Sequence, residues 1–387
     1  MNSRPSILII GAGFTGCALA HDLSLRGVNV TVLERGEIAS GTSGRTHGLL
    51  HSGARYCVTD PEAAIECITE SRILSQIAAQ CIEYNGGLFV ALNDQDLAYS
   101  AAFEQGAQAT GIPIERLSPQ QALQREPNLN PNLLAAYTVP DGTFDPLRLA
   151  LAFAATARQN GAVFLTHHEV QALHADGQGR ITKLTAWNRH TGQQQTFTAD
   201  LIISATGAWA GQIAAMVGAS TVVKPTPGIM VAYNQRLVHH AINRLCPPDD
   251  GDILIPQRRM VVIGTTSFEV ENPDYIPITA EQTEQMQRAA EALVPAIANT
   301  QRRGVYMSAR PLIVSGSSGR SLSRTFKCYD HEALDGLPGL ITITGGKATT
   351  CRIMAEKTAD LACQKLGLSA PCRTKDVPLR SYRLYYS

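Results

Sequence analysis

The segment 51-HSGARY-56 places an imidazole, two small residues, a guanidinium group and a phenol close together. A surface loop rarely needs that mixture, whereas a pocket that holds an anionic substrate beside a cofactor does. Elsewhere, Arg310 and Lys347 are each the only cation in a short apolar or glycine-rich setting. Guanidinium forks and an ammonium group suit a phosphate dianion, so we predict an anion site formed by Arg55, Arg310 and Lys347. The alternative is that Arg55 and Arg310 make structural ion pairs.

The overall charge does not supply that site. Lys and Arg together number 33, as do Asp and Glu, so no global field attracts nucleic acid or an acidic surface. With 44% hydrophobic and 17% charged residues, the 387-residue chain has the composition of a globular protein long enough for two domains. Its nine cysteines form no C-x-x-C pair, which argues against a zinc ribbon or an iron–sulfur ligand run and indicates reduced thiols. We therefore predict no metal site and no nucleic-acid partner.

A nucleotide site is predicted near the N-terminus. The segment 11-GAGFTG-16 matches G-x-G-x-x-G and lies between an apolar strand over 6–10 and a helical pattern over 14–25. A second strand over 29–33 leads into Glu34, at the spacing at which an acidic residue binds a ribose. This context favours a dinucleotide-binding turn over a chance run of glycines.

Each glycine of the motif has its own expected role. Gly11 allows the tight turn, Gly13 lets a pyrophosphate approach the backbone, and Gly16 permits close packing of the helix on the strand. The N-terminus of the helix would face the phosphates. Glu34 would accept hydrogen bonds from a ribose whose 2′-hydroxyl carries no phosphate.

The dinucleotide is predicted to be FAD rather than NAD. A second strand ends in glycine at 202-IISATGAW-209, and far downstream 344-TGGKATT-350 leads into a helix over 351–363. A flavin ring lies far from its adenine and needs its own cradle, which a nicotinamide domain does not require. The helix after Gly346 would direct its N-terminus to the flavin edge where negative charge collects on reduction. The alternative for this segment is an ordinary strand-to-helix turn.

Further elements follow from start signals and apolar runs. Helices are expected to begin at Asp60-Pro61 and at Asp145-Pro146, where Asp is the N-cap and Pro the first helical residue. The first is expected to continue past Cys81 and the second to end near Asn160-Gly161. Strands are expected over 162–170, 201–207 and 340–346, and short antiparallel strands with turns over 88–140 and 220–330.

These elements predict an α/β fold in which a Rossmann-like FAD-binding domain is interleaved with an antiparallel-sheet substrate domain. The FAD-binding domain would comprise 1–87, 141–219 and 331–372. The substrate domain would comprise 88–140 and 220–330, and 373–387 would form a loosely ordered C-terminal tail.

Together these segments resemble the FAD-dependent glycerol-3-phosphate dehydrogenases, within the D-amino-acid-oxidase-like flavoprotein superfamily. The similarity is closest to the catalytic subunit of the anaerobic type and covers nearly the whole chain. It rests on 11-GAGFTG-16, 39-ASGTSGRTHGLLHSGARYCVTD-60, 140-PDGTFDP-146, 309-ARPL-312 and 341-ITITGGKATTCRIMAE-356. The resemblance implies oxidation of sn-glycerol 3-phosphate to dihydroxyacetone phosphate with reduction of FAD. It also implies that Arg55, Arg310 and Lys347 face the substrate and that the loop 42–47 lines the flavin.

The predicted site has a catalytic part and a cofactor-binding part. The catalytic part comprises His51, Arg55, Arg310 and Lys347. The cofactor-binding part comprises Gly11, Gly13, Gly16, Glu34, Arg35, Thr42, Ser43, His47, Val170, Thr206, Gly207, Trp209, Gly345, Gly346, Lys347, Ala348, Thr349 and Thr350.

The expected chemistry is direct hydride transfer from the carbinol carbon to flavin N5, with the remote phosphate orienting that carbon. His51 is the candidate base, because an imidazole can accept a proton at neutral pH; the alternative is a positioning role. Two other functions stay open. One is FAD-dependent oxidation of a 2-hydroxy acid or amino acid, whose carboxylate can use the same arginines. The other is a flavin-binding subunit or redox sensor without its own substrate.

Two departures limit what the resemblance implies. The stretch 224-KPTPGIMVAY-233 keeps Gly228 but has Pro227, Ile229 and Met230 at positions that are polar in the family, which leaves open a different phosphorylated or carboxylated alcohol. In the family, the catalytic subunit of the anaerobic type usually carries a C-terminal extension with clustered cysteines, and this sequence has no such cluster. Electrons are therefore expected to pass to a quinone, a separate iron–sulfur subunit or a small acceptor.

The protein is expected to be cytoplasmic, and contact of the tail 373–387 with the inner face of a membrane stays open. The apolar segment 7–20 resembles a signal-peptide core, but one basic residue, Arg4, precedes it and its glycines belong to the nucleotide motif. No window of the sequence reaches the run of about twenty apolar residues that spans a bilayer.

Overall fold

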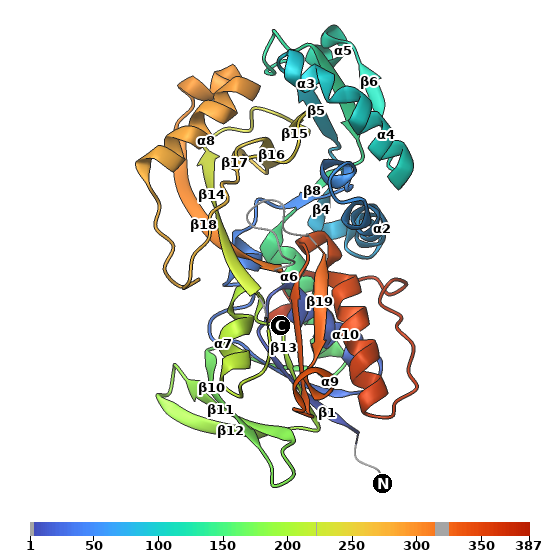
Figure 1. Ribbon diagram of the computed structural model, residues 1–387, viewed down its shortest axis with the longest axis vertical. Helices are drawn as coiled ribbons and strands as arrows, with labels where there is room; N and C mark the ends of the chain where they lie inside the picture. Colours follow the sequence, from blue (N-terminus) through green and yellow to red (C-terminus); the bar gives the residue numbers. More distant parts are fainter. Residues whose placement is uncertain (1–3, 222, 314–324) are drawn as a thin grey trace.

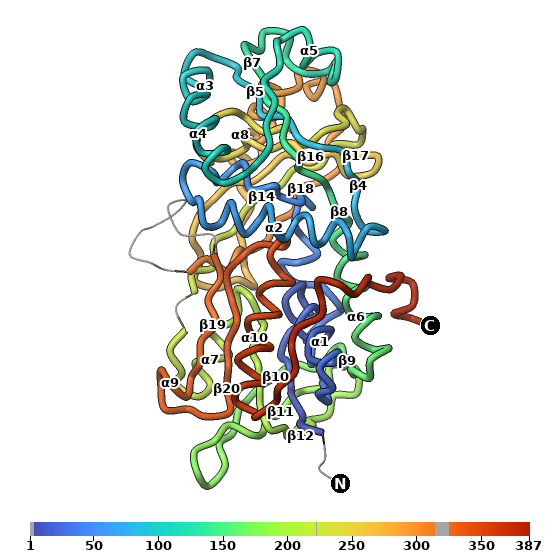
Figure 2. The backbone as a smooth tube through the Cα atoms, turned by 90° about the vertical axis from the view of Figure 1, so that its right-hand side faces the viewer, coloured from blue at the N-terminus to red at the C-terminus, as the bar shows by residue number. Residues whose placement is uncertain are grey.

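The molecule is elongated, with one large β-sheet at each end (Figure 1). The computed structural model describes residues 4–221, 223–313 and 325–387. Helix α2 (Pro61–Ile77) crosses the middle of the molecule between the two ends (Figure 2). Within the described ranges, no helix is both long and apolar enough to cross a membrane.

The first sheet is six-stranded and mostly parallel. Its spatial order is β19 (Phe326–Asp330), β20 (Leu340–Gly345), β13 (Leu201–Ser204), β1 (Ser6–Ile10), β2 (Asn29–Leu33) and β9 (Val163–Leu165). Among these described strands, β19 and β20 pair antiparallel and the others pair parallel. Helices α1 (Phe14–Leu25), α6 (Pro146–Gln159) and α10 (Cys351–Lys365) cover one face (Figure 2). The other face packs on α7 (Ala210–Ala215) and on a three-stranded sheet of β10 (His168–Ala175), β11 (Ile181–Asn188) and β12 (Gln193–Thr198).

The second sheet is eight-stranded and mostly antiparallel. Its order is β18 (Arg302–Ile313), β14 (Val223–Tyr233), β17 (Met260–Gly264), β16 (Ile253–Gln257), β15 (Ala241–Arg244), β5 (Gly87–Ala91), β7 (Ala135–Val139) and β6 (Glu115–Leu117). The helices at this end are α3 (Asp94–Ala98), α4 (Ser100–Thr110), α5 (Pro119–Arg125) and α8 (Ala280–Leu293). A small sheet of β3 (Leu49–Leu50), β8 (Gly142–Phe144) and β4 (Ile82–Glu83) and the short helix α9 (His331–Asp335) complete the fold. The mixed α/β architecture with one parallel and one antiparallel sheet confirms the predicted fold class.

The first β-α-β unit forms where the sequence predicts it, because the glycine motif leaves room for the turn. Gly11 has φ +100°, in the left-handed region that suits glycine, and a Cβ there would lie 2.8 Å from the carbonyl oxygen of Ala205. A Cβ on Gly16 would overlap the carbonyl oxygen of Gly11. The helix therefore starts directly against the end of the strand, as the prediction for Gly16 required.

The stretch predicted as a single strand over 162–170 is two strands in two different sheets. β9 ends at Leu165 and β10 begins at His168. Between them His167 has φ +59°, a left-handed conformation that interrupts any continuous strand. The apolar run could not show this break, because the residues on both sides have similar β-propensity.

Two helix predictions also need correction, and the first concerns the end of α2. This helix ends at Ile77 rather than past Cys81, and a 3₁₀ turn over Ala79–Cys81 follows it. The carbonyl of Ile77 accepts a hydrogen bond of 2.7 Å from the backbone N–H of Leu379 in the C-terminal segment, so a distant part of the chain satisfies the helix end.

The second correction is that the two regions predicted as short strands and turns also contain helices, namely α3, α4, α5 and α8. Two of these begin at capping boxes, Ser118 with Gln121 and Thr279 with Gln282. These are sequence signals for a helix start that the emphasis on short apolar strands missed.

The segment 373–387 is packed on the molecule, which corrects the expectation of a loosely ordered tail. Leu379 and Tyr385 are buried, and the last 3₁₀ turn (Tyr382–Tyr385) packs on α6. The guanidinium of Arg158 donates to the carbonyl of Tyr385 and lies 5.1 Å from its ring. Because backbone and side chain are both engaged, this end of the chain is held against the six-stranded sheet's helical face (Figure 2).

The division into domains stays a prediction. Its boundary at 87/88 lies within β5, and its boundary at 330/331 lies directly after β19. Residues 1–3, 222 and 314–324 of the predicted domains lie outside the described part of the chain.

Candidate active site

A cavity of about 590 Å³ lies where the carboxyl ends of the parallel strands face the eight-stranded sheet. Ligands of open α/β sheets bind at this edge. Most predicted site residues line it: Gly11, Gly13, Glu34, Arg35, Thr42, Ser43, His47, His51, Arg55, Val170, Thr206, Gly207, Trp209, Arg310, Gly345, Gly346, Lys347 and Ala348. The predicted residues Gly16, Thr349 and Thr350 are buried beside it rather than lining it.

Glu34 marks the end of the cavity that suits an adenosine ribose. One carboxylate oxygen accepts a hydrogen bond of 2.8 Å from the N–H of Ala12, and the other accepts one of 2.8 Å from the N–H of Gly36. These bonds fix the carboxylate at the turn after β1. The oxygen bonded to Gly36 also accepts a longer hydrogen bond of 3.4 Å from the Ser40 hydroxyl, and the oxygen bonded to Ala12 can accept from a further donor. The position fits a pair of ribose hydroxyls.

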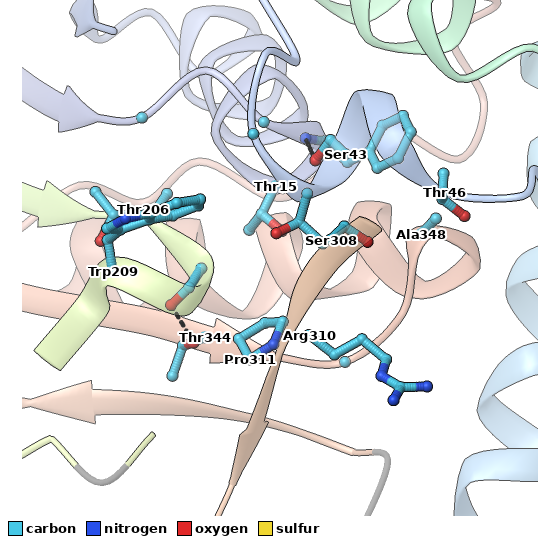
Figure 3. A pocket seen from close by; sticks show the side chains of 18 of the residues that line it. Thr15, Ser43, Thr46, Thr206, Trp209, Ser308, Arg310, Pro311, Thr344 and Ala348 are labelled. Carbon is cyan, nitrogen blue, oxygen red and sulfur yellow. Dashed lines mark hydrogen bonds between the residues drawn. The ribbon is translucent and has the colours of Figure 1, made fainter. Parts of the chain in front are cut away.

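The first turn of α1 forms the middle of the cavity (Figure 3). The Ser43 hydroxyl accepts a hydrogen bond of 2.9 Å from the N–H of Phe14, and a Cβ on Gly13 would lie 2.9 Å from the same oxygen. Only glycine leaves this space open. A helix N-terminus with an approachable backbone is a suitable place for a pyrophosphate.

The adenosine end is bordered by a cluster that joins the two halves of the molecule. The Arg35 guanidinium lies 4.4 Å from the centre of the Trp209 ring, and both side chains donate to Asp274, at 2.6 and 3.0 Å. Although partial burial alone would raise the pKa of Asp274, the hydrogen bonds from Arg35 and Trp209 lower it. Asp274 lies in the connection between β17 and α8, which belongs to the eight-stranded end.

The opposite end of the cavity is a glycine turn. Gly345 and Gly346 have φ +87° and +67°, and the N–H of Lys347 donates to the Thr350 hydroxyl at 3.0 Å. The Thr349 hydroxyl accepts a hydrogen bond of 3.1 Å from the N–H of His51. The two threonines therefore fix the turn and the backbone at His51, and they are buried without lining the cavity. The carboxylate, the helix N-terminus and the glycine turn together fit the length and polarity of FAD.

Arg55 enters the cavity as one partner of a buried ion pair. Its guanidinium lies 2.6 Å from the carboxylate of Asp252, and the side chains are 7% and 2% exposed. Burial alone would lower the pKa of Arg55, but the Asp252 charge raises it above its ordinary value. Arg55 thus makes the structural ion pair that the sequence left as an alternative, and it lines the cavity as well.

Arg310 projects from β18 at the cavity (Figure 3). It donates to the carbonyls of Thr226, Pro227 and Thr266 at 2.9 to 3.2 Å and to the hydroxyl of Thr265 at 2.8 Å. These bonds fix the direction of the guanidinium without removing its charge.

Lys347 and the HSGARY segment meet at the flavin end. The ammonium group of Lys347 lies 4.7 Å from the centre of the Tyr56 ring, and the Tyr56 and His51 rings are 5.4 Å apart. The cavity therefore brings Arg55, Arg310, Lys347 and His51 together.

The segment 224–233 differs from the family pattern, and two of its residues form part of the cavity wall. Gly228 and Met230 line the cavity, and a Cβ on Gly228 would lie 2.8 Å from the Cβ of Thr265. Ile229 is fully buried, and Pro227 contributes a carbonyl to Arg310. Met230 is therefore the replaced side chain that can contact a substrate.

Sequence reasoning missed several residues of the site. Asp252 binds Arg55, and Thr265 binds Arg310. Asp274 binds both Arg35 and Trp209, and Ser308 lines the wall beside Arg310. The only available signal was weak, namely an acidic residue directly before the apolar run 253–256. The pairing of Asp252 with Arg55 spans 197 positions, so no local pattern could reveal it.

Comparison with known proteins identifies the family. Residues 6–361 match the protein family described as FAD dependent oxidoreductase, known as DAO. The chain belongs to this family. Its cofactor is accordingly FAD, as predicted, and the cavity has the groups that FAD requires.

Relatives and solved structures agree with this assignment. The chain is 43% identical over 377 residues to a subunit of the anaerobic glycerol-3-phosphate dehydrogenase of Escherichia coli, covering 96% of this chain and 69% of the relative. It is 40% identical over 392 residues to a subunit of the anaerobic glycerol-3-phosphate dehydrogenase of Haloferax volcanii, covering 98% and 67%. The glycerol-3-phosphate dehydrogenase of Bacillus halodurans, complexed with FAD, has the same fold with a TM-score of 0.75 at 24% identity, covering 98% and 68%. These likenesses confirm the predicted resemblance and the predicted FAD-dependent oxidoreductase class.

Proposed function

We propose that the protein oxidises sn-glycerol 3-phosphate to dihydroxyacetone phosphate with FAD as the electron acceptor. The observation that carries the proposal is the convergence of Arg55, Arg310 and Lys347 in the cavity that also fits FAD. The relatives of known name support it, since two that are at least 40% identical are anaerobic glycerol-3-phosphate dehydrogenase subunits.

The substrate's phosphate would be held by the two arginines and its reacting end would lie beside the glycine turn. Arg310, already directed by four neutral acceptors, needs no large rearrangement to receive an anion. FAD, when bound, supplies the acceptor for the two electrons that leave the carbinol carbon. The apolar side chains of Met230 and Ile253 line the same cavity and would help to keep water from that carbon.

The reaction also releases the hydroxyl proton of the substrate, which needs an acceptor. His51 is the proposed base, because it lines the cavity at the flavin end and is 8% exposed. Its backbone N–H donates to the Thr349 hydroxyl, so the backbone that carries the imidazole is fixed directly after β3.

A carboxylate-bearing alcohol is the second candidate substrate. The Asp252 charge balances that of Arg55, which reduces the net positive charge of the anion site. A site with fewer net charges accommodates a monoanion such as a 2-hydroxy acid more readily than a clamp of three uncompensated cations would.

We also infer that the electrons continue to a quinone or to a separate electron-transfer subunit. The designation of the relatives as subunits supports a multi-subunit enzyme. A cytoplasmic location beside the inner face of a membrane is the setting we propose for that transfer.

The test is anaerobic reduction of the purified holoenzyme, followed by loss of the oxidised-flavin absorption band. sn-Glycerol 3-phosphate should bleach the flavin, whereas glycerol, 2-hydroxyglutarate and a D-amino acid should not. Bleaching by the hydroxy acid or amino acid alone would replace the proposed substrate with the second candidate class. Absence of bleaching by any of the compounds would leave the FAD site intact and contradict the dehydrogenase proposal.

A further inference from the structure

His47 lines the same cavity as Arg55 and Arg310, and the proposed reaction gives it no role. The family resemblance placed it in the flavin-lining loop 42–47, four residues before His51. In the structure it lines the cavity, its ring centre lies 6.2 Å from that of His51, and its own backbone carbonyl accepts a hydrogen bond of 2.9 Å from Gln257. The backbone of this residue is therefore fixed, and its ring faces the substrate region.

The protonation pattern of the ring follows from one hydrogen bond. The Nδ1 atom of His47 lies 3.1 Å from the backbone nitrogen of Leu49, which can only donate. Nδ1 must therefore be the acceptor, and the neutral ring carries its proton on Nε2. Among the described residues, none forms a hydrogen bond with Nε2, so this donor is available to a molecule in the cavity.

The surroundings keep the imidazole neutral. Burial and then the positive charges of Arg55 and Arg310 lower the pKa of His47 to about 4. The bond to Leu49 acts in the same direction, because a protonated Nδ1 could not accept it. With Nδ1 occupied and Nε2 protonated, the ring has no lone pair for a substrate proton, so His47 cannot be the general base.

We propose that His47 is a substrate-binding residue that donates its Nε2–H, as a neutral imidazole, to the anionic group held by Arg55 and Arg310. The assignment rests on the proposed function and deepens it. Arg55 and Arg310 line the same cavity and their positive charges act on this ring, so an anionic oxygen is the acceptor that the site favours. A neutral donor adds a directional hydrogen bond there without adding a further buried charge. It also leaves His51 as the histidine with the proton-accepting role.

The experiment compares the holoenzyme with His47→Gln and His47→Leu. The Gln amide can place an N–H near the position of Nε2, whereas Leu keeps the bulk and removes the donor. Inorganic phosphate binding is measured by perturbation of the flavin absorption spectrum, and sn-glycerol 3-phosphate binding by the concentration dependence of anaerobic reduction. Bound-flavin content and thermal unfolding establish that each variant is folded.

The His47→Leu variant should weaken both ligands about tenfold or more, the typical effect of losing one hydrogen bond to a charged group, and His47→Gln should recover most of that loss. The ratio of the two dissociation constants, Leu variant over wild type, should stay constant between about pH 6 and 8, because a neutral ring does not titrate there. Unchanged affinity for both ligands in His47→Leu would overturn the assignment, as would a ratio that falls toward one with rising pH.

Failure of the two proposals can be told apart. If phosphate binding depends on His47 but glycerol 3-phosphate does not reduce the flavin, the anion-donor assignment stands and the proposed substrate is wrong. If glycerol 3-phosphate reduces the wild type and His47→Leu equally, with equal affinity, the proposed function stands and His47 has no part in anion binding.

Discussion

The cofactor end and the substrate end of the cavity are formed by different kinds of chemical group. At the cofactor end, backbone groups and missing side chains form the site: the turn at Gly11, the open space at Gly13 and the first turn of α1. At the substrate end, charged side chains from distant segments form it, above all Arg55 with Asp252 and Arg310 on β18. The first end should not tolerate added volume at Gly11, Gly13 or Gly16. The substrate end should tolerate a change of side-chain volume better than the removal of one partner of a buried ion pair.

The largest expected effect is a change of volume at the cofactor end. Gly16→Val would place a branched side chain into the carbonyl of Gly11, which is backbone and cannot move aside. We expect loss of FAD binding and of soluble protein, measured by flavin content per purified chain. Gly211→Ala is the matched control, because a Cβ there meets nothing within 4 Å and α7 should accept it. A Gly16→Val protein with full flavin content would contradict the expectation that the cofactor end does not tolerate added volume.

A smaller loss is expected when a charge partner is removed at the substrate end. Arg55→Met leaves the Asp252 carboxylate buried without its cation, which should cost about 3 kcal/mol of unfolding free energy. Chemical denaturation measures this change. Arg125→Met is the control, since its pair with Glu115 is 41% and 63% exposed and should contribute less than about 1 kcal/mol. Equal effects in both variants would show that burial of the Arg55 pair is energetically unimportant.

The two ends of the cavity also differ in how far the sequence could predict them. The glycine motif and Glu34 belong to one β-α-β unit, β1, α1 and β2, whose elements the sequence predicted from local patterns. The partners of Arg55 and Arg310 lie 197 and as few as 44 positions away, and only the folded sheets bring them together. The break at His167 and the docking of the C-terminal segment were missed for the same reason, because both depend on tertiary contacts.

A third effect concerns a buried histidine on α1, away from the cavity. His21 on α1 is fully buried, neither ring nitrogen has a hydrogen-bond partner within the described residues, and burial lowers its pKa to about 4. The unfolded chain binds this proton below about pH 6.5 whereas the folded chain does not until about pH 4, so stability falls as the pH drops through that window.

His21→Leu should remove a share of that loss, about 3 kcal/mol at the acid end, while leaving stability at neutral pH equal or higher. Denaturation curves across the pH window measure it, and substitution of the exposed His190 by Gln provides the comparison. An unchanged pH dependence of stability in His21→Leu would show that protonation of His21 does not cause the loss of stability at acid pH.

The smallest effect is expected at the cluster that joins the two ends. Asp274→Asn weakens the hydrogen bonds to Arg35 and Trp209, whose side chains border the adenosine end. Because the Arg35–Asp274 pair is 36% and 46% exposed, FAD should dissociate only a few-fold faster, about what an exposed pair contributes. Recovery of flavin fluorescence on release measures the rate. Glu269→Gln, in a similarly exposed pair with Lys224, is the control and should leave the rate unchanged.

We propose that the substrate end selects an alcohol through the anionic group that the alcohol carries. The most direct measurement is anaerobic flavin reduction by sn-glycerol 3-phosphate and by glycerol, in the wild type and in Arg310→Met. The wild type should prefer the phosphorylated substrate, and Arg310→Met should reduce this preference by about a hundredfold, the scale of losing charged hydrogen bonds. An unchanged preference in a folded, flavin-loaded Arg310→Met protein would contradict the account.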